Sequence, residues 1–164
     1  MTQLKTIQVP LATGKQKRRK ETRSQFAALP YRVRDDGEVE VLLVTSRGTR
    51  RWILPKGWPM RGLTPAETAL QEAWEEAGVR GRATDHCLGF YSYEKWFSPK
   101  SQVPCVVSVF PVEVEELADD FPEKGERKRK WFTRKKAAQK VDEAELRSII
   151  KSFNPELLKG SAHR

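Results

Sequence analysis

The segment TPAETALQEAWEEAG carries a complete set of start and stop signals for one α-helix. Thr64 can act as the N-cap, and Pro65 suits the first helical position because its missing N–H costs nothing there. Glu67 completes a capping box with Thr64, and Gly78 can close the helix in the left-handed conformation. On a helical wheel the alanines share one arc, which lets a helix approach a sheet closely. We therefore predict a helix over residues 65–77 that packs on a sheet.

Three glutamates crowd the end of this predicted helix, although the chain as a whole has a net charge of +9. Glu72, Glu75 and Glu76 fall on an arc beside the alanines, at the margin of the packed surface. Like charges one turn apart cost about 0.2–0.5 kcal/mol per pair, and acids near a helix C-terminus also oppose the helix dipole. One interpretation is a solvated acidic face. The other is a site for a divalent cation, since Mg²⁺ is held by a few carboxylates together with water and phosphate oxygens.

The region before this helix has the pattern of a β-hairpin. Residues 24–33 and 39–46 are strand-like runs, and Asp36-Gly37 between them is typical of a tight hairpin turn. Pro30 cannot donate a hydrogen bond to a neighbouring strand. We therefore expect the first run to be an edge strand or to contain a bulge.

The rest of the chain adds strands and a second amphipathic segment. Further strand-like runs are residues 51–55, 86–97 and 103–114. Near the C-terminus, apolar residues at helical spacing predict one buried face: Leu146, Ile149, Ile150, Phe153 and Leu157. Strands with one helix in mid-chain and one near the end predict an α+β fold, a mixed β-sheet sandwiched between helices (α/β/α).

The length of 164 residues suits a single domain. We expect a basic, flexible N-terminal tail over residues 1–22, one domain over residues 23–158 and a frayed end over residues 159–164. The excess of basic residues favours a polyanionic partner, such as a nucleotide, an inositol phosphate or nucleic acid.

Cellular location is suggested by what the sequence lacks. Cys87 and Cys105 form neither a disulfide framework nor a metal-binding spacing. The first residues contain no apolar segment typical of a signal peptide, and no run approaches the ~18 apolar residues of a membrane span. We expect a cytoplasmic protein without a membrane partner, either a monomer or a homodimer.

The segment GWPMRGLTPAETALQEAWEEAGV, residues 57–79, resembles the Nudix box, the signature of Nudix hydrolases. Its pattern is glycine, five residues, glutamate, seven residues, and then Arg-Glu-aliphatic-x-Glu-Glu-x-Gly-aliphatic. The residues that match it without a gap are Gly57, Glu72, Glu75, Glu76, Gly78 and Val79. The resemblance implies the Nudix fold and a pyrophosphohydrolase that acts on acid anhydrides.

Two positions depart from the box. Leu63 stands where the family has its first glutamate, and Gln71 stands where it has arginine. These two residues tend to form a salt bridge in the family, so both partners are missing together. Losing both leaves no unpaired buried charge, whereas losing one would be costly. The departures motivate one alternative function, a Nudix-fold binding module without catalysis.

The runs VEVLLVTSRGTRRWILPKG and ERKRKWF look like the diphosphoinositol polyphosphate phosphohydrolase and diadenosine polyphosphate hydrolase branch. That branch implies hydrolysis of a diphosphate linkage in a polyphosphorylated small molecule, with Mg²⁺, or alternatively Mn²⁺, as the cofactor. A second alternative is removal of diphosphate from RNA 5′ ends, which the basic tail and the RKRK run motivate.

The resemblance also assigns roles to residues. It implies that Glu72 and Glu76, with Glu75, bind the metal and act in catalysis, while the backbone carbonyl near Lys56 and Gly57 completes the metal site. The general base varies among Nudix enzymes, and Glu126 and Glu123 in the loop before Trp131 are candidates. Both could instead be loop charges that balance the RKRK run. The basic residues expected to hold phosphate groups are Arg47, Arg50, Arg51, Lys56, Arg127 and Arg129.

Overall fold

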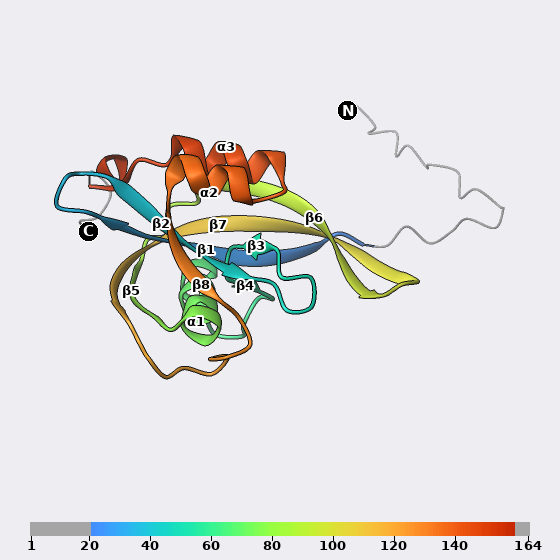
Figure 1. The fold of residues 1–164 in the computed structure, drawn as a ribbon. Coiled ribbons are helices and arrows are strands. Elements are labelled where there is room, and N and C mark those ends of the chain that lie inside the picture. The colour runs from blue at the N-terminus through green and yellow to red at the C-terminus, as the bar shows by residue number, and fades with distance from the viewer. Residues whose placement is uncertain (1–20, 160–164) are drawn as a thin grey trace, which may run out of the picture.

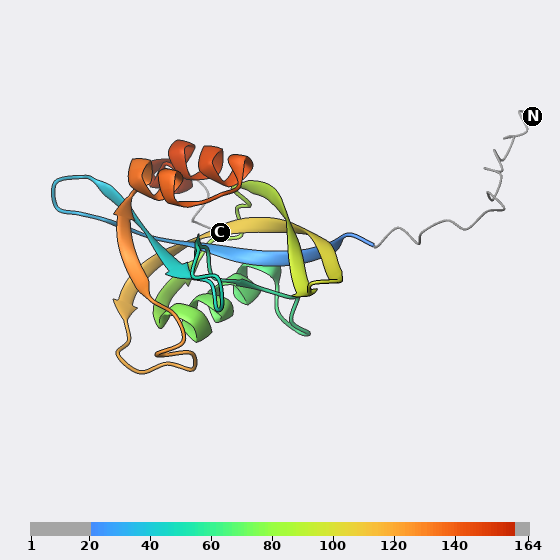
Figure 2. The same cartoon turned by 45° about the vertical axis from the view of Figure 1, so that its right-hand side comes forward.

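The computed structural model describes residues 21–159. One mixed sheet separates helix α1 from helices α2 and α3 (Figures 1 and 2). The strands are β1 Arg23–Val33, β2 Val39–Thr45, β3 Trp52–Ile53, β4 Lys56–Gly57, β5 Val79–Ala83, β6 Gly89–Ser98, β7 Ser101–Leu117 and β8 Arg129–Thr133. The helices are α1 Pro65–Ala77, α2 Arg134–Lys140, α3 Ala144–Ser152 and the 3₁₀ turn η1 Pro155–Leu158. This arrangement confirms the predicted α/β/α sandwich.

The sheet has the strand order β3-β2-β1-β7-β5, while β4 pairs with β1, β6 with β7 and β8 with β2. The pairing of β1 with β7 is parallel and the other pairings are antiparallel. The predicted hairpin between β1 and β2 is confirmed. Gly37 has a φ of 88° and donates its N–H to the carbonyl of Arg34, and Glu38 donates its N–H to Asp36.

Pro30 lies in a central strand, so the prediction of an edge strand was wrong. Along β7 the register of β1 is unbroken, which also excludes the bulge. On the other side of β1, pairing with β4 ends at Ala27 and pairing with β2 begins at Tyr31. On that side the backbone N–H of Ala28 donates to the carbonyl of Pro55. Because backbone N–H groups alternate along a strand, an N–H at position 30 would point to the same side as that of Ala28. The proline thus lies where β1 passes from one partner to the next and needs no donor.

Helix α1 begins and ends as predicted. The side chain of Thr64 accepts from the N–H of Glu67, and the Glu67 carboxylate accepts from the N–H of Thr64. Gly78 closes the helix with a φ of 69°. The alanine face of α1 is buried against the sheet in a cluster with Phe110 and other apolar strand residues. This packing fixes the adjoining acidic arc at the edge of the sheet.

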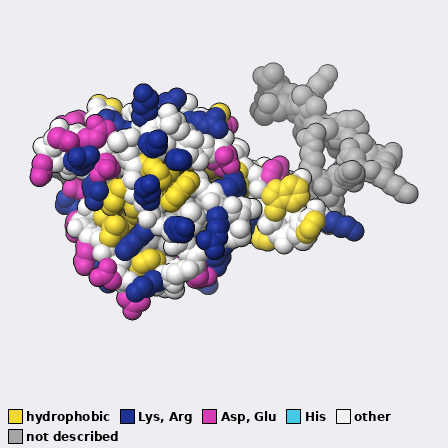
Figure 3. Space-filling view, in the orientation of Figure 1, with side chains coloured by type: hydrophobic (Ala, Val, Ile, Leu, Met, Phe, Trp, Pro, Cys, Tyr) yellow, Lys and Arg dark blue, Asp and Glu magenta, His cyan; other side chains and the backbone are white. Residues whose placement is uncertain are grey.

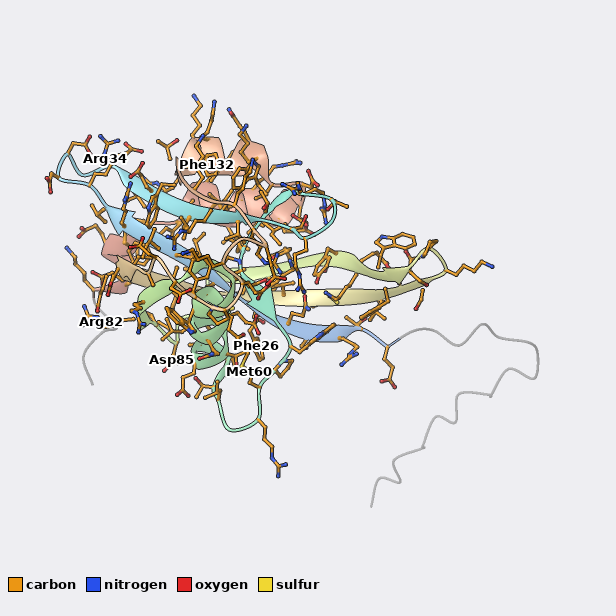
Figure 4. The ribbon with its side chains drawn as sticks, turned by 60° about the horizontal axis from the view of Figure 1, so that its bottom comes forward. Phe26, Arg34, Met60, Arg82, Asp85 and Phe132 are labelled. Carbon is orange, nitrogen blue, oxygen red and sulfur yellow. The ribbon has the colours of Figure 1, made fainter. Side chains whose placement is uncertain are left out.

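The opposite face of the sheet carries the larger core, covered by α2 and α3. In Figure 4, Phe132 lies toward α2 and α3 and Phe26 lies on the other side, near α1. Four of the five predicted apolar positions near the C-terminus are buried: Leu146, Ile149, Ile150 and Phe153. The prediction for Leu157 was wrong, since its side chain is 76% exposed. Pro155 starts a separate 3₁₀ turn there, which buries Leu158 instead.

Several expectations concern the two ends of the chain. The tail expected over residues 1–22 and the frayed end expected over residues 159–164 lie almost entirely outside the described residues. Within residues 21–159, no helix is both long and apolar enough to span a membrane.

Candidate active site

A cavity of about 480 Å³ lies beside the acidic arc of α1. Side chains from distant parts of the sequence line it, including both helix α1 and the loops that follow β2 and precede β8. The lining residues are Gln25, Ser46, Arg47, Thr49, Arg51, Ile53, Lys56, Gly57, Trp58, Glu72, Glu76, Tyr93, Glu94, Lys95, Trp96, Glu123 and Arg127. Carboxylates, cations and aromatic rings therefore line one shared cavity.

The carboxylate of Glu72 lies directly against Gly57. A Cβ atom at position 57 would come within 2.1 Å of Glu72 Oε1, so no larger residue fits there without moving this side chain. Gly57 belongs to β4, which pairs with Phe26 and Ala27 of β1. The sheet thus holds the glycine backbone in place beneath a carboxylate from the helix.

Glu76 is almost completely buried and has a partner for each oxygen. Its Oε2 accepts from the backbone N–H of Lys56 at 2.7 Å, and its Oε1 lies 2.8 Å from the guanidinium of Arg127. The side chains of Glu76 and Arg127 are only 4% and 8% exposed. A buried carboxylate needs such pairing, because an isolated charge inside a protein is very costly.

Arg127 connects three elements around the cavity. In addition to Glu76 of α1, it binds Glu123 at 3.1 Å and the backbone carbonyl of Thr45, at the end of β2, at 3.1 Å. Glu123 in turn donates its N–H to the carbonyl of Glu75. The positive charge paired with Glu76 is therefore that of Arg127, in the loop before β8. Position 71 of α1, where the box has arginine, is Gln71 in this chain.

The pKa values of the two helix carboxylates at the cavity, Glu72 and Glu76, are raised. Burial first, and then the negative charges of Glu76, Glu75 and Glu123, raise the pKa of Glu72 to about 8. Burial also raises the pKa of Glu76, against the opposing effect of Arg127. Without a cation, Glu72 therefore holds a proton at neutral pH.

The chemistry of these residues fits a divalent cation bound mainly by oxygen atoms. Within residues 21–159, no three acidic, histidine or cysteine side chains gather closely enough to enclose a metal by themselves. Mg²⁺ does not require this, because one or two carboxylates with water and substrate phosphates suffice. The half-buried Glu72 beside the Gly57 backbone offers such oxygens, and a cation would offset the burial and the neighbouring negative charges that raise its pKa. Glu76 keeps free lone pairs on both oxygens even with its present partners.

The structure brings together eight of the predicted site residues at the cavity: Arg47, Arg51, Lys56, Gly57, Glu72, Glu76, Glu123 and Arg127. Four others do not line it: Arg50, Glu75, Glu126 and Arg129. The Glu126 carboxylate lies 3.4 Å from the guanidinium of Arg47 and is exposed. Arg129 donates to the carbonyl of Ala77 at 2.7 Å and so binds the C-terminal end of α1.

Sequence reasoning missed the side of the cavity that β1 and β6 form. Gln25 accepts a hydrogen bond from the hydroxyl of Tyr93, and the ring of Tyr93 lies 4.9 Å from the Lys56 ammonium. Trp58 and Trp96 also line the cavity. The apolar and aromatic pattern of β6 indicated a strand, but only the register of β6 on β7 shows which of its side chains face the glutamates.

Comparisons with known proteins agree with this geometry. The model of the family described as "NUDIX domain" matches residues 23–153. Nudix hydrolase 12, mitochondrial, from Arabidopsis thaliana is 31% identical over 147 residues, which cover 77% of this chain and 71% of that protein. Diphosphoinositol polyphosphate phosphohydrolase 3-alpha from Homo sapiens is 36% identical over 102 residues, which cover 60% of this chain and 58% of that protein.

Solved structures show the same fold at lower sequence identity. The Ap4A hydrolase of C. elegans superposes with a TM-score of 0.58 at 20% identity, covering 84% of this chain and 99% of that one. The dihydroneopterin triphosphate pyrophosphohydrolase of E. coli has a TM-score of 0.59 at 18% identity, with coverage of 81% and 97%.

Proposed function

Because this chain belongs to the Nudix hydrolase family, we propose that it hydrolyses a diphosphate linkage in a polyphosphorylated small molecule, with Mg²⁺ as the cofactor. The observation that carries the proposal is the approach of Glu72 to Gly57 inside a cavity that also contains Lys56 and Arg127. A carboxylate that a divalent cation would satisfy, next to basic side chains, suits the binding of a phosphate chain.

The proposed metal ligands are Glu72 and Glu76, supported by Glu75 and by the backbone carbonyl near Lys56 and Gly57. Bound Mg²⁺ would supply Lewis acidity, which neutralises charge on phosphate oxygens and lowers the pKa of bound water. Glu75 does not line the cavity, yet its negative charge contributes to the raised pKa of Glu72. It therefore acts on the site through the local electrostatic field.

The chain's own basic groups bind and orient the substrate. Lys56, Arg47 and Arg51 line the cavity and can donate charge-assisted hydrogen bonds to phosphate oxygens. Arg127 positions the carboxylates, since its donors already serve Glu76, Glu123 and a backbone carbonyl. These contacts hold the charged groups in place before the substrate binds. Charged groups held in this way stabilise the charge that develops in the transition state.

Proton transfer from the attacking water needs a base near the reacting phosphorus. Glu123 and Glu126 are the two candidates. Glu123 lines the cavity and is held by Arg127, whereas Glu126 is exposed and paired with Arg47. Substituting each by glutamine separately identifies the base as the residue whose loss lowers kcat without changing metal affinity.

The proposed function is tested by hydrolysis assays of the purified chain with Mg²⁺. The substrates are diadenosine polyphosphates, diphosphoinositol polyphosphates and 5′-triphosphorylated RNA, and the variants are Glu72→Gln and Glu76→Gln. We expect turnover of a small-molecule substrate by the wild type and a loss of at least about a hundredfold in both variants, as for removal of a transition-state interaction. Equal activity in all three proteins would overturn the assigned site.

Two further results would favour the alternative functions. Turnover of RNA alone would indicate the 5′-pyrophosphohydrolase. Calorimetric titration with Mg²⁺ and Mn²⁺ addresses the non-catalytic binding module. Absence of both turnover and metal binding in a folded protein would favour that alternative.

A further inference from the structure

Strand β6 is the longest strand of the described sheet that is paired along one side only. Its ten residues, Gly89–Ser98, pair with β7, and within residues 21–159 no other strand pairs with it. The two strands extend together beyond the rest of the sheet as a hairpin (Figures 1 and 2). The unpaired edge of a strand presents a row of backbone N–H and C=O groups to which another strand can bind.

Proteins usually protect such an edge with charged side chains, proline or a covering element. The edge strands β5 and β8 are five residues long, and each contains two basic side chains. Strand β6 contains no proline, and its single lysine, Lys95, has its ammonium 5.8 Å from the ring centres of both Trp58 and Phe97 of its own chain. The register of β6 on β7 is regular from Gly89 to Trp96. A long, regular and weakly protected edge is therefore left open.

Large apolar side chains also gather on this hairpin (Figure 3). Six large apolar side chains are exposed in the described part of the chain, and three of them lie on β6: Phe90 at 61%, Trp96 at 62% and Phe97 at 56%. Because side chains alternate along a strand, Phe90 and Trp96 share one face with the exposed Ser92 and Glu94. The two rings lie about 20 Å apart along the strand, so neither covers the other within one chain.

A second copy of the chain fits this edge in a defined register. An antiparallel pair with a two-fold axis at Tyr93 sets each residue of β6 opposite the one equally far on the other side of position 93. Phe90 then lies opposite Trp96 of the partner subunit, and Ser92 lies opposite Glu94 of the partner subunit. Directly opposed side chains have Cβ atoms about 4.5–5.5 Å apart, so the two rings meet and the serine hydroxyl can donate to the carboxylate. Symmetry repeats both contacts.

Neighbouring registers fit less well. A two-fold axis at Glu94 or at Lys95 would set two like charges directly opposite each other, which is destabilising. An axis at Ser92 would move Trp96 past the start of β6 in the partner subunit, where it has no strand residue to pair with. The axis at Tyr93 uses both exposed rings and opposes no like charges.

We propose that the chain forms a symmetric dimer in which two copies of β6 pair antiparallel about Tyr93. The sheet of one subunit then continues into that of the other, and Phe90 and Trp96 of both subunits are covered. Those four side chains bury about 400–600 Å², roughly half of the ~1,000 Å² of a specific interface, and the paired backbones add to it. Because Trp96 lines the cavity that contains Glu72, Phe90 of the partner subunit lies at the rim of that cavity.

Disulfide cross-linking tests the register directly. The variant combines Phe90→Cys with Trp96→Cys in the full chain, with Cys87→Ser to remove the partly exposed native thiol. The two new thiols cannot bond to each other within one strand, because they lie about 20 Å apart. We expect a covalent dimer under mild oxidation that reductant dissolves, while each single-cysteine variant stays unlinked. The pair Phe90→Cys with Glu94→Cys, which fits an axis at Ser92, is the register control and should stay unlinked too.

The oligomeric state provides the second test, measured by light scattering and sedimentation equilibrium. We expect a wild-type dimer at micromolar concentration and a dissociation constant at least about tenfold higher for Phe90→Lys, since the substitution occurs twice in the interface. The matched control is Leu157→Lys, because Leu157 is an exposed apolar residue outside β6 and its substitution should leave the dimer unchanged. Neither measurement involves hydrolysis, so the result is independent of the proposed function.

Three outcomes would overturn the proposal. The first is a wild type that stays monomeric up to about 100 µM. The second is a Phe90→Lys variant that dimerises as well as the wild type, or a dimer in which the pair Phe90→Cys with Trp96→Cys does not cross-link. The third is a monomeric wild type that dimerises after deletion of residues 1–20, which would assign the open edge to the N-terminal segment of the same chain.

Discussion

The guanidinium of Arg127 lies 2.8 Å from Glu76 Oε1, and both side chains are buried at the end of helix α1. Breaking a buried ion pair by removing one partner typically costs about 3–5 kcal/mol, because the other charge is left uncompensated. We therefore expect Arg127→Gln to lower the free energy of unfolding of the metal-free protein by about that amount, as measured by urea denaturation.

A double-mutant cycle isolates this pair. The combination Arg127→Gln with Glu76→Gln should cost less than the sum of the two single substitutions, because the double variant contains no unpaired charge. The control is Glu156→Gln, which removes the exposed contact with Lys159 and should leave stability unchanged. Strictly additive effects of Arg127 and Glu76 would show that the pair is not coupled.

Glu72 should make the stability of the metal-free protein depend on pH. Its pKa is about 8 in the folded state and near the usual value of 4.5 in the unfolded chain. Between these values the folded state holds the extra proton, so stability falls as pH rises from about 4.5 to about 8. Urea denaturation across this range should show the decline, and Glu72→Gln should reduce it. A wild type and a variant with identical pH profiles would contradict the assignment.

The same proton should compete with the metal. Because a carboxylate must lose its proton to bind a cation, Mg²⁺ affinity should rise as pH approaches about 8 and then level off. Calorimetry at several pH values measures the Mg²⁺ affinity. Repeating the titration in buffers of different ionisation enthalpy gives the number of protons released on binding as an independent check. Affinity that is constant between pH 6 and pH 8 would exclude Glu72 as the titrating ligand.

The lack of a side chain at Gly57 should matter for metal binding for steric reasons. Its φ is not in the left-handed region, so alanine is acceptable to the backbone, but the new Cβ would lie 2.1 Å from Glu72 Oε1. Gly57→Ala should therefore displace the carboxylate and weaken Mg²⁺ binding by about 10–100-fold, with little effect on Tm. The control Gly125→Ala has the opposite profile: its φ of 87° makes alanine strained, yet no atom lies near the added Cβ. It should lower Tm and leave metal affinity unchanged.

The parts of the fold that could be predicted from sequence are those encoded by neighbouring residues. The caps of α1 lie within one turn of the helix, and the turn at Gly37 lies between two strands that it joins. Strand β8 was missed because its basic side chains hide the alternation, and Pro30 was misjudged because its neighbours in the sheet were unknown.

The site residues also divide into those that could be predicted from nearby sequence and those that depend on distant contacts. Glu72 and Glu76 could be identified because the box fixes their spacing on one helix. The role of Arg127 could not, since it depends on contact with the backbone of Thr45, which is 82 residues away. The place of Trp96 at the cavity also could not be predicted, because it depends on the pairing of β6 with β7.

Arg129 provides a test that separates support of the helix from substrate binding. The Arg129 side chain does not line the cavity. Its guanidinium instead donates a hydrogen bond to the carbonyl of Ala77 at 2.7 Å and lies 4.9 Å from the centre of the Phe121 ring. Arg129→Met removes a charge-assisted hydrogen bond at the C-terminus of α1, so we expect the free energy of unfolding to fall by about 1.5–3 kcal/mol. Under folding conditions, KM for the substrate should stay within about twofold of the wild type. Arg51→Met, at the cavity, is the comparison and should raise KM without affecting stability, because its contact with Asp142 is exposed. A rise in KM for Arg129→Met equal to that for Arg51→Met would assign Arg129 to the substrate after all.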